Sequence, residues 1–127
     1  KNLQKHSAYI LYNTELPGYD NEQHRLLSTL ARYHLGNFKL PEMFKFSRYH
    51  EQDVLALIRI LRLAIILNRA RQATEKPQEI TLKIDRTLVD WHLTFETDYL
   101  QHNPLVKNDL ALEHRFLQTL GLSLSTR

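Results

Sequence analysis

Residues 48–71 read RYHEQDVLALIRILRLAIILNRAR, and this stretch decides the fold. It contains neither glycine nor proline, and its apolar residues recur at the spacing of one broad helix face. Its most apolar run, residues 61–67, is interrupted by Arg62 and is far shorter than the roughly 20 residues that a bilayer span requires. The stretch therefore predicts a long, buried helix edged with arginine, and no transmembrane segment is expected.

Two shorter helices are predicted before the long one. The first covers residues 7–13 and stops before the turn signal Leu-Pro-Gly at residues 16–18. The second spans about 21–35, with Asp20 or Asn21 as its N-terminal cap. The N-terminal part of the chain is therefore expected to be entirely helical.

After the long helix the hydrophobic period changes to two. Ile80, Leu82 and Ile84 alternate with polar residues, which predicts a half-buried strand. A turn near residues 85–87 precedes a second alternating run that ends at Phe95. The two runs are expected to form a hairpin.

A helix should follow this hairpin, because Asn103 suits a helix cap, Pro104 suits a first helical position and Gly121 suits the end. Three of its residues are expected to cover the sheet: Leu112, Phe116 and Leu120. Leu122 and Leu124 then alternate with serines, which favours a third strand. The predicted fold is α+β and mainly α, with a helical domain at 1–73 and a small β-β-α-β domain at 74–127.

Positive charge is concentrated in the first part of the chain. Residues 1–72 hold eleven Lys and Arg against six Asp and Glu, whereas residues 73–127 hold six against eight. Such a field attracts polyanions, including acidic lipid, so peripheral membrane association stays open. The absence of cysteine excludes disulfides and thiolate metal sites and makes the cytoplasm the default location. Because the chain begins without methionine or a leader, it is expected to be an excised fragment.

No catalytic or metal-binding motif is recognisable. The seven histidines form no H-E-x-x-H or similar ligand spacing, and His50-Glu51 is better explained as polar residues at a helix start. The sequence also lacks a glycine-rich phosphate loop and a nucleophile elbow. We therefore expect no catalytic residue, metal or cofactor in this chain.

A basic cluster on and beside the long helix is the remaining candidate site. Guanidinium groups bind phosphate oxygens in bidentate fashion, so a line of arginines without acidic neighbours suits a polyphosphoryl ligand. The alternative is a solvated helix edge whose aliphatic stems cover apolar surface. Arg59 belongs to the same line. The residues predicted to contact phosphate are Lys5, His6, Arg32, His34, Arg62, Arg69 and Arg71.

Four stretches, in this order and spacing, resemble the C-terminal region of bacterial exopolyphosphatases. They are KHSAYIL at residues 5–11, LPGY at 16–19, RYH at 32–34 and LRLAIILN at 61–68. The likeness continues into the hairpin strand of Trp91 and so covers nearly the whole chain. The paralogous guanosine pentaphosphate phosphohydrolases share the fold and part of the pattern.

The resemblance implies a parent enzyme whose catalytic glutamate and Mg²⁺ lie in two N-terminal actin-like domains, which this chain lacks. It also implies that the helical part is a partial, degenerate HD-like domain. HD-type domains place a metal-binding aspartate in a Leu-x-x-Ala-Asp-x-Leu context, and Ile65 stands at that position here. Since isoleucine cannot coordinate a hard cation, the resemblance implies no metal site in this chain.

Three functional hypotheses follow. The first is a non-catalytic C-terminal fragment of an exopolyphosphatase, which binds inorganic polyphosphate and contributes to a homodimer with the actin-like domains of the same chain. The second is the equivalent region of a guanosine pentaphosphate phosphohydrolase. The third, a small basic nucleic-acid-binding domain, is supported only by charge and lacks a helix-turn-helix or aromatic RNA-binding signature, so no nucleic acid is expected.

Overall fold

The computed structural model describes residues 3–36, 46–73 and 77–127. The chain divides into two compact units, Lys1–Arg62 and Leu63–Arg127, and each is described by itself. The fold is α+β and mainly helical, as the sequence predicts. The domain boundary between residues 73 and 74, and the likeness of the helical part to an HD-type domain, stay predictions.

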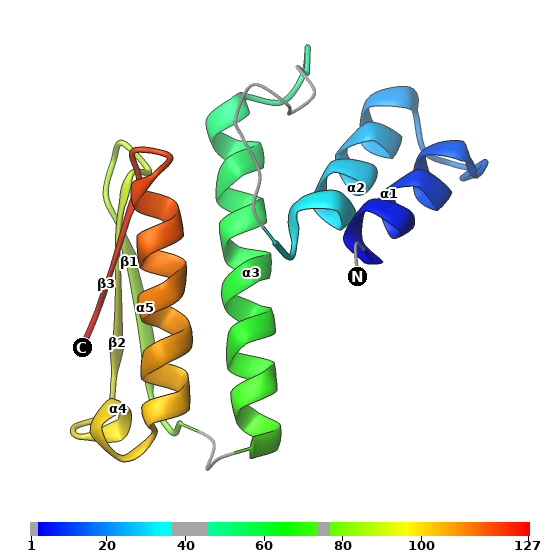
Figure 1. Ribbon diagram of the computed structural model, residues 1–127. Helices are drawn as coiled ribbons and strands as arrows, with labels where there is room; N and C mark the ends of the chain where they lie inside the picture. Colours follow the sequence, from blue (N-terminus) through cyan, green and yellow to red (C-terminus); the bar gives the residue numbers. More distant parts are fainter. Residues whose placement is uncertain (1–2, 37–45, 74–76) are drawn as a thin grey trace. The chain divides into compact units, whose positions relative to one another are not determined.

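The N-terminal unit contains a hairpin of two helices, α1 (Leu3–Asn13) and α2 (Asn21–Tyr33). Figure 1 shows them side by side, running in opposite directions. They pack closely because small side chains lie between them. Ala8 and Ser28 are buried, and the Ser28 hydroxyl donates a hydrogen bond to the Ala8 carbonyl oxygen at 2.9 Å. α1 begins earlier than the predicted start at residue 7.

The start of α2 follows the sequence prediction. Asp20 is the N-cap, and its carboxylate accepts a hydrogen bond from the backbone N–H of Gln23 at 2.8 Å. The Gln23 side chain in turn accepts a hydrogen bond from the Asp20 N–H at 3.0 Å. This reciprocal arrangement is a capping box, which fixes where the helix begins.

The long helix is α3 (Glu51–Ala73). Val54 and Ile58 are buried in its first part, and Leu63 and Ile66 are buried in its second part. α3 therefore confirms the long helix that residues 48–71 predict. Within the described ranges, no helix is both long and apolar enough to cross a bilayer.

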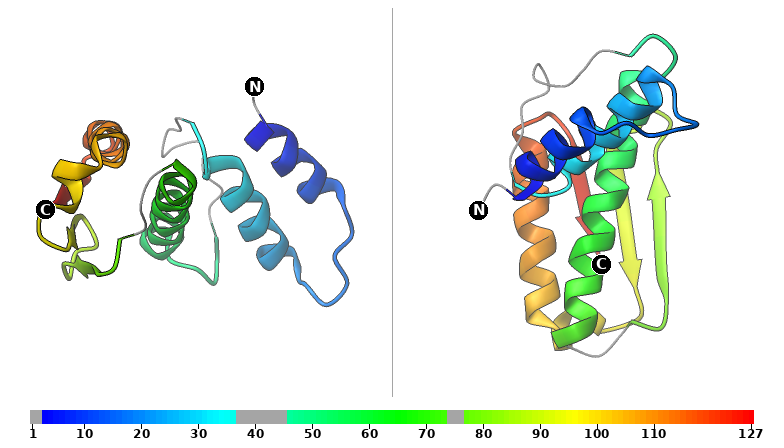
Figure 2. Two further views of the ribbon diagram at one scale, coloured as in Figure 1. Left: turned by 90° about the horizontal axis from the view of Figure 1, so that it is seen from below. Right: turned by 90° about the vertical axis from the view of Figure 1, so that its right-hand side faces the viewer.

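The C-terminal unit holds a three-stranded sheet in the order β1-β2-β3. β1 (Ile80–Ile84) and β2 (Asp90–Phe95) form the predicted antiparallel hairpin, with Leu82 opposite Leu93. The chain then forms the short helix α4 (Tyr99–His102) and the helix α5 (Pro104–Gln118). β3 (Ser123–Thr126) returns parallel to β2. The right-hand view of Figure 2 shows the hairpin strands.

The core of this unit lies between α5 and the sheet, as Figure 1 shows. Trp91, Leu93 and Phe95 on one face of β2 are buried, as is Leu124 of β3. The buried apolar residues of α5 are Val106, Leu110 and Leu117. Burial of these side chains provides the main stabilisation of the unit.

Two details of the predicted core are wrong. β1 is exposed along its whole length, with Ile80, Leu82 and Ile84 exposed at 43%, 36% and 38%, although a half-buried strand was expected. The reason is its place in the sheet, since β1 is an edge strand and α5 packs against β3 at the opposite edge.

The predicted covering face of α5 is also displaced. Leu112 is 56% exposed, and Phe116 and Leu120 are only half-buried. The buried face instead includes Glu113, together with the three apolar residues named above. Glu113 occupies a buried position with a carboxylate, which interrupts the apolar pattern of the true buried face. The apolar pattern therefore predicted that the adjacent helix face, with Leu112 and Phe116, would be buried.

Candidate ligand-binding groove

A groove between α1 and α2 brings together two of the predicted phosphate-binding residues. Its volume is about 270 Å³, and its walls come from both helices of the hairpin. From α1 come Lys5, Tyr9 and Tyr12, which share one helix face because they are four and three residues apart. Arg32 comes from α2. The other lining residues are Ala8 and Ser28.

The groove combines two cations with two exposed aromatic rings. Lys5 is exposed, and the Arg32 guanidinium carbon lies 5.4 Å from the centre of the Tyr33 ring, a cation–π contact that orients it. Tyr9 and Tyr12 are 67% and 47% exposed. Because the described lining residues include no acid, the groove can attract phosphate and also offer rings for a planar base.

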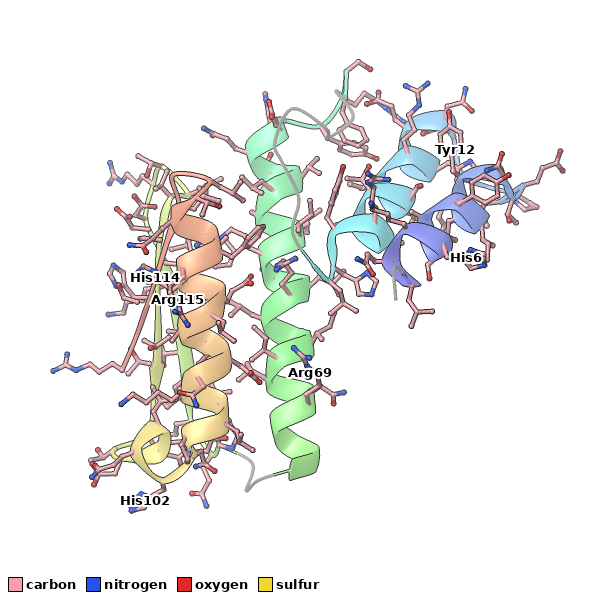
Figure 3. All side chains as sticks on the ribbon, viewed as in Figure 1. His6, Tyr12, Arg69, His102, His114 and Arg115 are labelled. Carbon is pink, nitrogen blue, oxygen red and sulfur yellow. The ribbon has the colours of Figure 1, made fainter. Side chains whose placement is uncertain are left out.

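A second cavity, of about 510 Å³, shares the lining residue Tyr12 with the groove. It is formed by the end of α1, the α1–α2 connection and the start of α2. The rings of Tyr12 and His24 lie 6.3 Å apart between their centres. Tyr12 therefore stands between two cavities of the helical hairpin, and Figure 3 labels it on α1.

The two histidines of the predicted cluster do not line the groove. His6 is exposed on α1 and is labelled in Figure 3. His34 is half-buried, and its ring Nδ1 is hydrogen-bonded to the Ala31 carbonyl oxygen. The His34 ring therefore makes a local contact at the end of its own helix.

Arg62 has a structural contact that the sequence did not indicate. It is 9% exposed, and its Nη1 donates hydrogen bonds to the carbonyl oxygens of Tyr33 at 3.0 Å and Gly36 at 2.7 Å. These carbonyls lie at and beyond the end of α2, where helical carbonyls lack intrahelical partners. Arg59 is also buried, at 2% exposure. Neither residue lies on a solvated helix edge.

Arg69 and Arg71 complete the predicted set. Arg69 is exposed on the part of α3 that belongs to the C-terminal unit, and Figure 3 labels it. The side chain of Arg71 lies outside the described residues. A role in polyphosphate binding stays a prediction for all seven residues.

The carboxylates at the start of α2 are paired. Arg48 forms an ion pair with Asp20, and its Nε lies 3.6 Å from a Glu22 carboxylate oxygen. The Gln23 N–H and then Arg48 lower the pKa of Asp20, while the Ser47 hydroxyl is the main cause of the lowered pKa of Glu22. Arg48 in turn has a raised pKa, mainly through its hydrogen bond with Asp20.

The sequence matches the family described as Ppx/GppA phosphatase, domain III, over residues 1–114. The chain belongs to the Ppx/GppA phosphatase family. All residues of the groove lie within the matched range. Across the described ranges, no three His, Asp or Glu side chains gather in a way that could hold a metal ion.

Curated relatives carry the name guanosine-5'-triphosphate,3'-diphosphate pyrophosphatase. The protein from Pseudoalteromonas translucida is 35% identical over 127 residues, which cover 98% of this chain and 24% of that relative. A Vibrio vulnificus protein is 36% identical over 86% of this chain and 21% of its own length. A Vibrio cholerae protein is 34% identical over 95% and 23%. The chain thus spans about a quarter of the length of these relatives.

These names favour the second functional hypothesis over the first. The family and the C-terminal position are as the resemblance implies, but these three relatives bear the name of the guanosine pentaphosphate pyrophosphatase and not that of an exopolyphosphatase.

The sequence analysis of this Ppx/GppA domain did not identify Tyr9 and Tyr12 as candidate site residues. Their spacing from Lys5 on one helix face was the signal that could have found them.

Proposed function

We propose that this chain is the domain III region of a guanosine-5'-triphosphate,3'-diphosphate pyrophosphatase, where it holds a phosphorylated ligand and does not cleave it. The observation that carries the proposal is the groove in which Lys5 and Arg32 lie beside Tyr9 and Tyr12. The names of the relatives supply the substrate class.

The chemistry of the groove suits a nucleotide better than a bare phosphate polymer. A guanosine pentaphosphate carries phosphate groups on both sides of its ribose and a flat purine base. Arg32 suits a bidentate contact with phosphate, and Lys5 adds a point charge from the facing helix. Exposed tyrosine rings can stack on a base, a contact worth about 1–3 kcal/mol. Inorganic polyphosphate has no base and would use only the cations.

The size of the groove limits what it holds. A volume of about 270 Å³ suits part of such a nucleotide, and the cavity of about 510 Å³ that shares Tyr12 adds room along the same hairpin. Ligand sites are commonly about 300–1,000 Å³. We therefore propose that the base and the phosphates are held on the two sides of Tyr12.

Catalysis is proposed to lie elsewhere in the parent protein. The resemblance implies a catalytic glutamate and Mg²⁺ in actin-like domains, and this chain spans about a quarter of its relatives. Hydrolysis, Mg²⁺ binding, a homodimer and a cytoplasmic location stay predictions for the whole protein.

Binding measurements with two ligands test this proposal. Arg32→Ala and Lys5→Ala should each weaken the binding of guanosine pentaphosphate and of inorganic polyphosphate, and each should lower the log-log salt slope by about one unit. Tyr9→Leu should weaken only nucleotide binding, by about tenfold, because only the nucleotide has a base to stack.

Arg115→Ala is the matched control, since this arginine is exposed on α5 and its loss changes the net charge equally. If Arg115→Ala weakens binding as much as Arg32→Ala, the groove is not the site. If Tyr9→Leu leaves nucleotide affinity unchanged while the cation variants weaken both ligands, the polyphosphate hypothesis is favoured over the nucleotide.

A further inference from the structure

His114 on α5 makes a different hydrogen bond from the other histidines whose rings contact the backbone in the described part of the chain. The rings of His24, His34 and His102 contact carbonyl oxygens, which can only accept a hydrogen bond. The Nδ1 atom of His114 instead lies 3.0 Å from the backbone nitrogen of Leu124, whose N–H can only donate. Figure 3 labels His102 and His114.

This contact fixes the protonation state of the His114 ring. Because the Leu124 N–H donates, Nδ1 must present its lone pair, and the proton of the neutral ring is on Nε2. A charged imidazolium ring carries protons on both nitrogens and cannot accept. Acid therefore removes the acceptor at His114, whereas a histidine ring that donates to a carbonyl keeps its hydrogen bond.

The Leu124 N–H lies on the side of β3 that faces away from β2. Ser123 donates to the Val89 carbonyl and Arg127 donates to the Leu93 carbonyl, both in or beside β2. Because the direction alternates along a strand, the Leu124 N–H points the other way. Leu124 is only 3% exposed, so its N–H needs a protein partner, and His114 supplies one from α5.

On α5 itself the residues that share the face of His114 are uncharged. Those three or four positions away are Leu110, Ala111, Leu117 and Gln118. Glu113 and Arg115 adjoin His114 in sequence, but neighbouring positions on a helix do not face each other. A charged His114 ring would therefore gain no partner along its own helix face.

The elements around α5 add little charge. β3 contains no charged residue, and Arg127, which follows it, is exposed and positive. The titratable residues of α4 are Tyr99, whose ring stacks on that of Phe95, and the exposed His102. The buried face of β2, with Trp91, Leu93 and Phe95, has no titratable group.

We propose that His114 is an acid-sensitive link between α5 and β3. While the ring is neutral, its Nδ1 accepts the Leu124 N–H and connects the outer side of β3 to α5. Protonation places a hydrogen on Nδ1 that opposes the hydrogen of the N–H, and the link opens. Histidine changes its charge between about pH 8 and pH 5, so β3 is more loosely held below this range. The inference concerns the C-terminal unit alone and does not depend on the proposed function.

Amide hydrogen exchange of the whole chain, followed residue by residue by NMR, tests this link. The exchange rate of the Leu124 amide, divided by the rate of an unfolded peptide at the same pH, should be at least about fivefold higher at pH 5.5 than at pH 7.5, because a buried donor loses its acceptor. The amide of Leu110 within α5 is the internal control and should not change. Asp85 has a pKa lowered from 3.8, so it does not titrate in this window.

Two variants separate the titration of His114 from its packing. Asparagine places Oδ1 where histidine has Nδ1, so His114→Asn can accept the same N–H without titrating. It should keep the Leu124 amide protected at both pH values. His114→Leu has no acceptor, and its Leu124 amide should exchange at least about fivefold faster than that of the unmodified protein at pH 7.5.

Nitrogen chemical shifts of the ring give an independent measurement, since at pH 7.5 His114 should carry its proton on Nε2. A proton on Nδ1 at this pH would overturn the proposal. Equal relative exchange of the Leu124 amide at both pH values, or the same acid effect in His114→Asn as in the unmodified protein, would overturn it as well. If circular dichroism shows that His114→Leu does not fold, the unmodified protein and His114→Asn still decide the outcome.

Discussion

The two units differ in where some of their arginines and aromatic residues lie, although Tyr33 is buried and Arg48 is exposed in the N-terminal unit. In the N-terminal unit Arg59 and Arg62 are buried, while Tyr9 and Tyr12 are exposed. In the C-terminal unit the order is the usual one, because aromatic residues such as Trp91 are buried and the arginines at 86, 115 and 127 are exposed. The contacts of Arg62 are therefore structural, whereas Tyr9 and Tyr12 line the groove of the proposed site.

Trp91 gives the largest expected effect, because it is fully buried and its Nε1 donates a hydrogen bond to the Leu88 carbonyl at 3.0 Å. Trp91→Ala should lower the free energy of unfolding by about 3–5 kcal/mol. Urea denaturation measures the change, and Leu112→Ala, at an exposed position of α5, should change it by less than about 0.5 kcal/mol. Similar values for both variants would show that the sheet core does not dominate this unit.

Arg62 tests whether buried arginine in the N-terminal unit is structural. Arg62→Met should lower the free energy of unfolding by about 1.5–3 kcal/mol, because the carbonyls of Tyr33 and Gly36 lose a charged donor. Arg69→Met is the matched control on the same helix, and its exposed side chain predicts a change below about 0.5 kcal/mol. Equal effects in thermal or urea unfolding would remove the distinction between the two arginines.

Local sequence signals predicted the elements well. The capping residue Asp20, the hairpin and the helix beginning at Pro104 all depend on residues that are close in sequence. Burial of the strands was less predictable, because β1 and β2 have the same alternating pattern but β1 lies at the edge of the sheet and β2 lies in its centre. Sequence periodicity predicts a strand, but it does not predict whether another element packs over that strand.

The candidate site was predictable only in part. Lys5 and Arg32 were recognised from their charge, and the groove brings them together. The structural contacts of Arg62 could not be predicted, because its partners lie 29 and 26 residues away in the chain. A charged residue on an apolar helix can donate hydrogen bonds to carbonyl groups at the end of a helix that is distant in sequence, and only the tertiary fold shows which helix end accepts them.

The cap of α2 should have a smaller effect than either buried side chain. Asp20→Ala removes the hydrogen bond to the Gln23 N–H and the ion pair with Arg48, and it should lower the free energy of unfolding by less than Arg62→Met does. The adjacent exposed residue supplies the control, and Asn21→Ala should change stability less. Calorimetry on both variants checks this, and an equal change would argue that the capping box contributes little.

The smallest expected effect is the dependence of stability on acid, and it separates the two units again. Asp20 and Glu22 in the N-terminal unit and Asp85 in the C-terminal unit have pKa values below their ordinary 3.8, 4.5 and 3.8, the last mainly because the Thr87 hydroxyl donates to the carboxylate. A group whose pKa is lower in the folded state stabilises the fold above its unfolded pKa and loses that contribution as the pH falls through the folded pKa.

Through these three carboxylates, the midpoint of urea unfolding should therefore not change with pH above about pH 5, and it should decrease as the pH falls below that value. Asp20→Asn should flatten the acid limb for the N-terminal unit and Asp85→Asn for the C-terminal unit, when each is followed through its own amide exchange. If Asp85→Asn flattens the N-terminal limb as well, the two units unfold as one, and the contrast between them is confined to their surfaces.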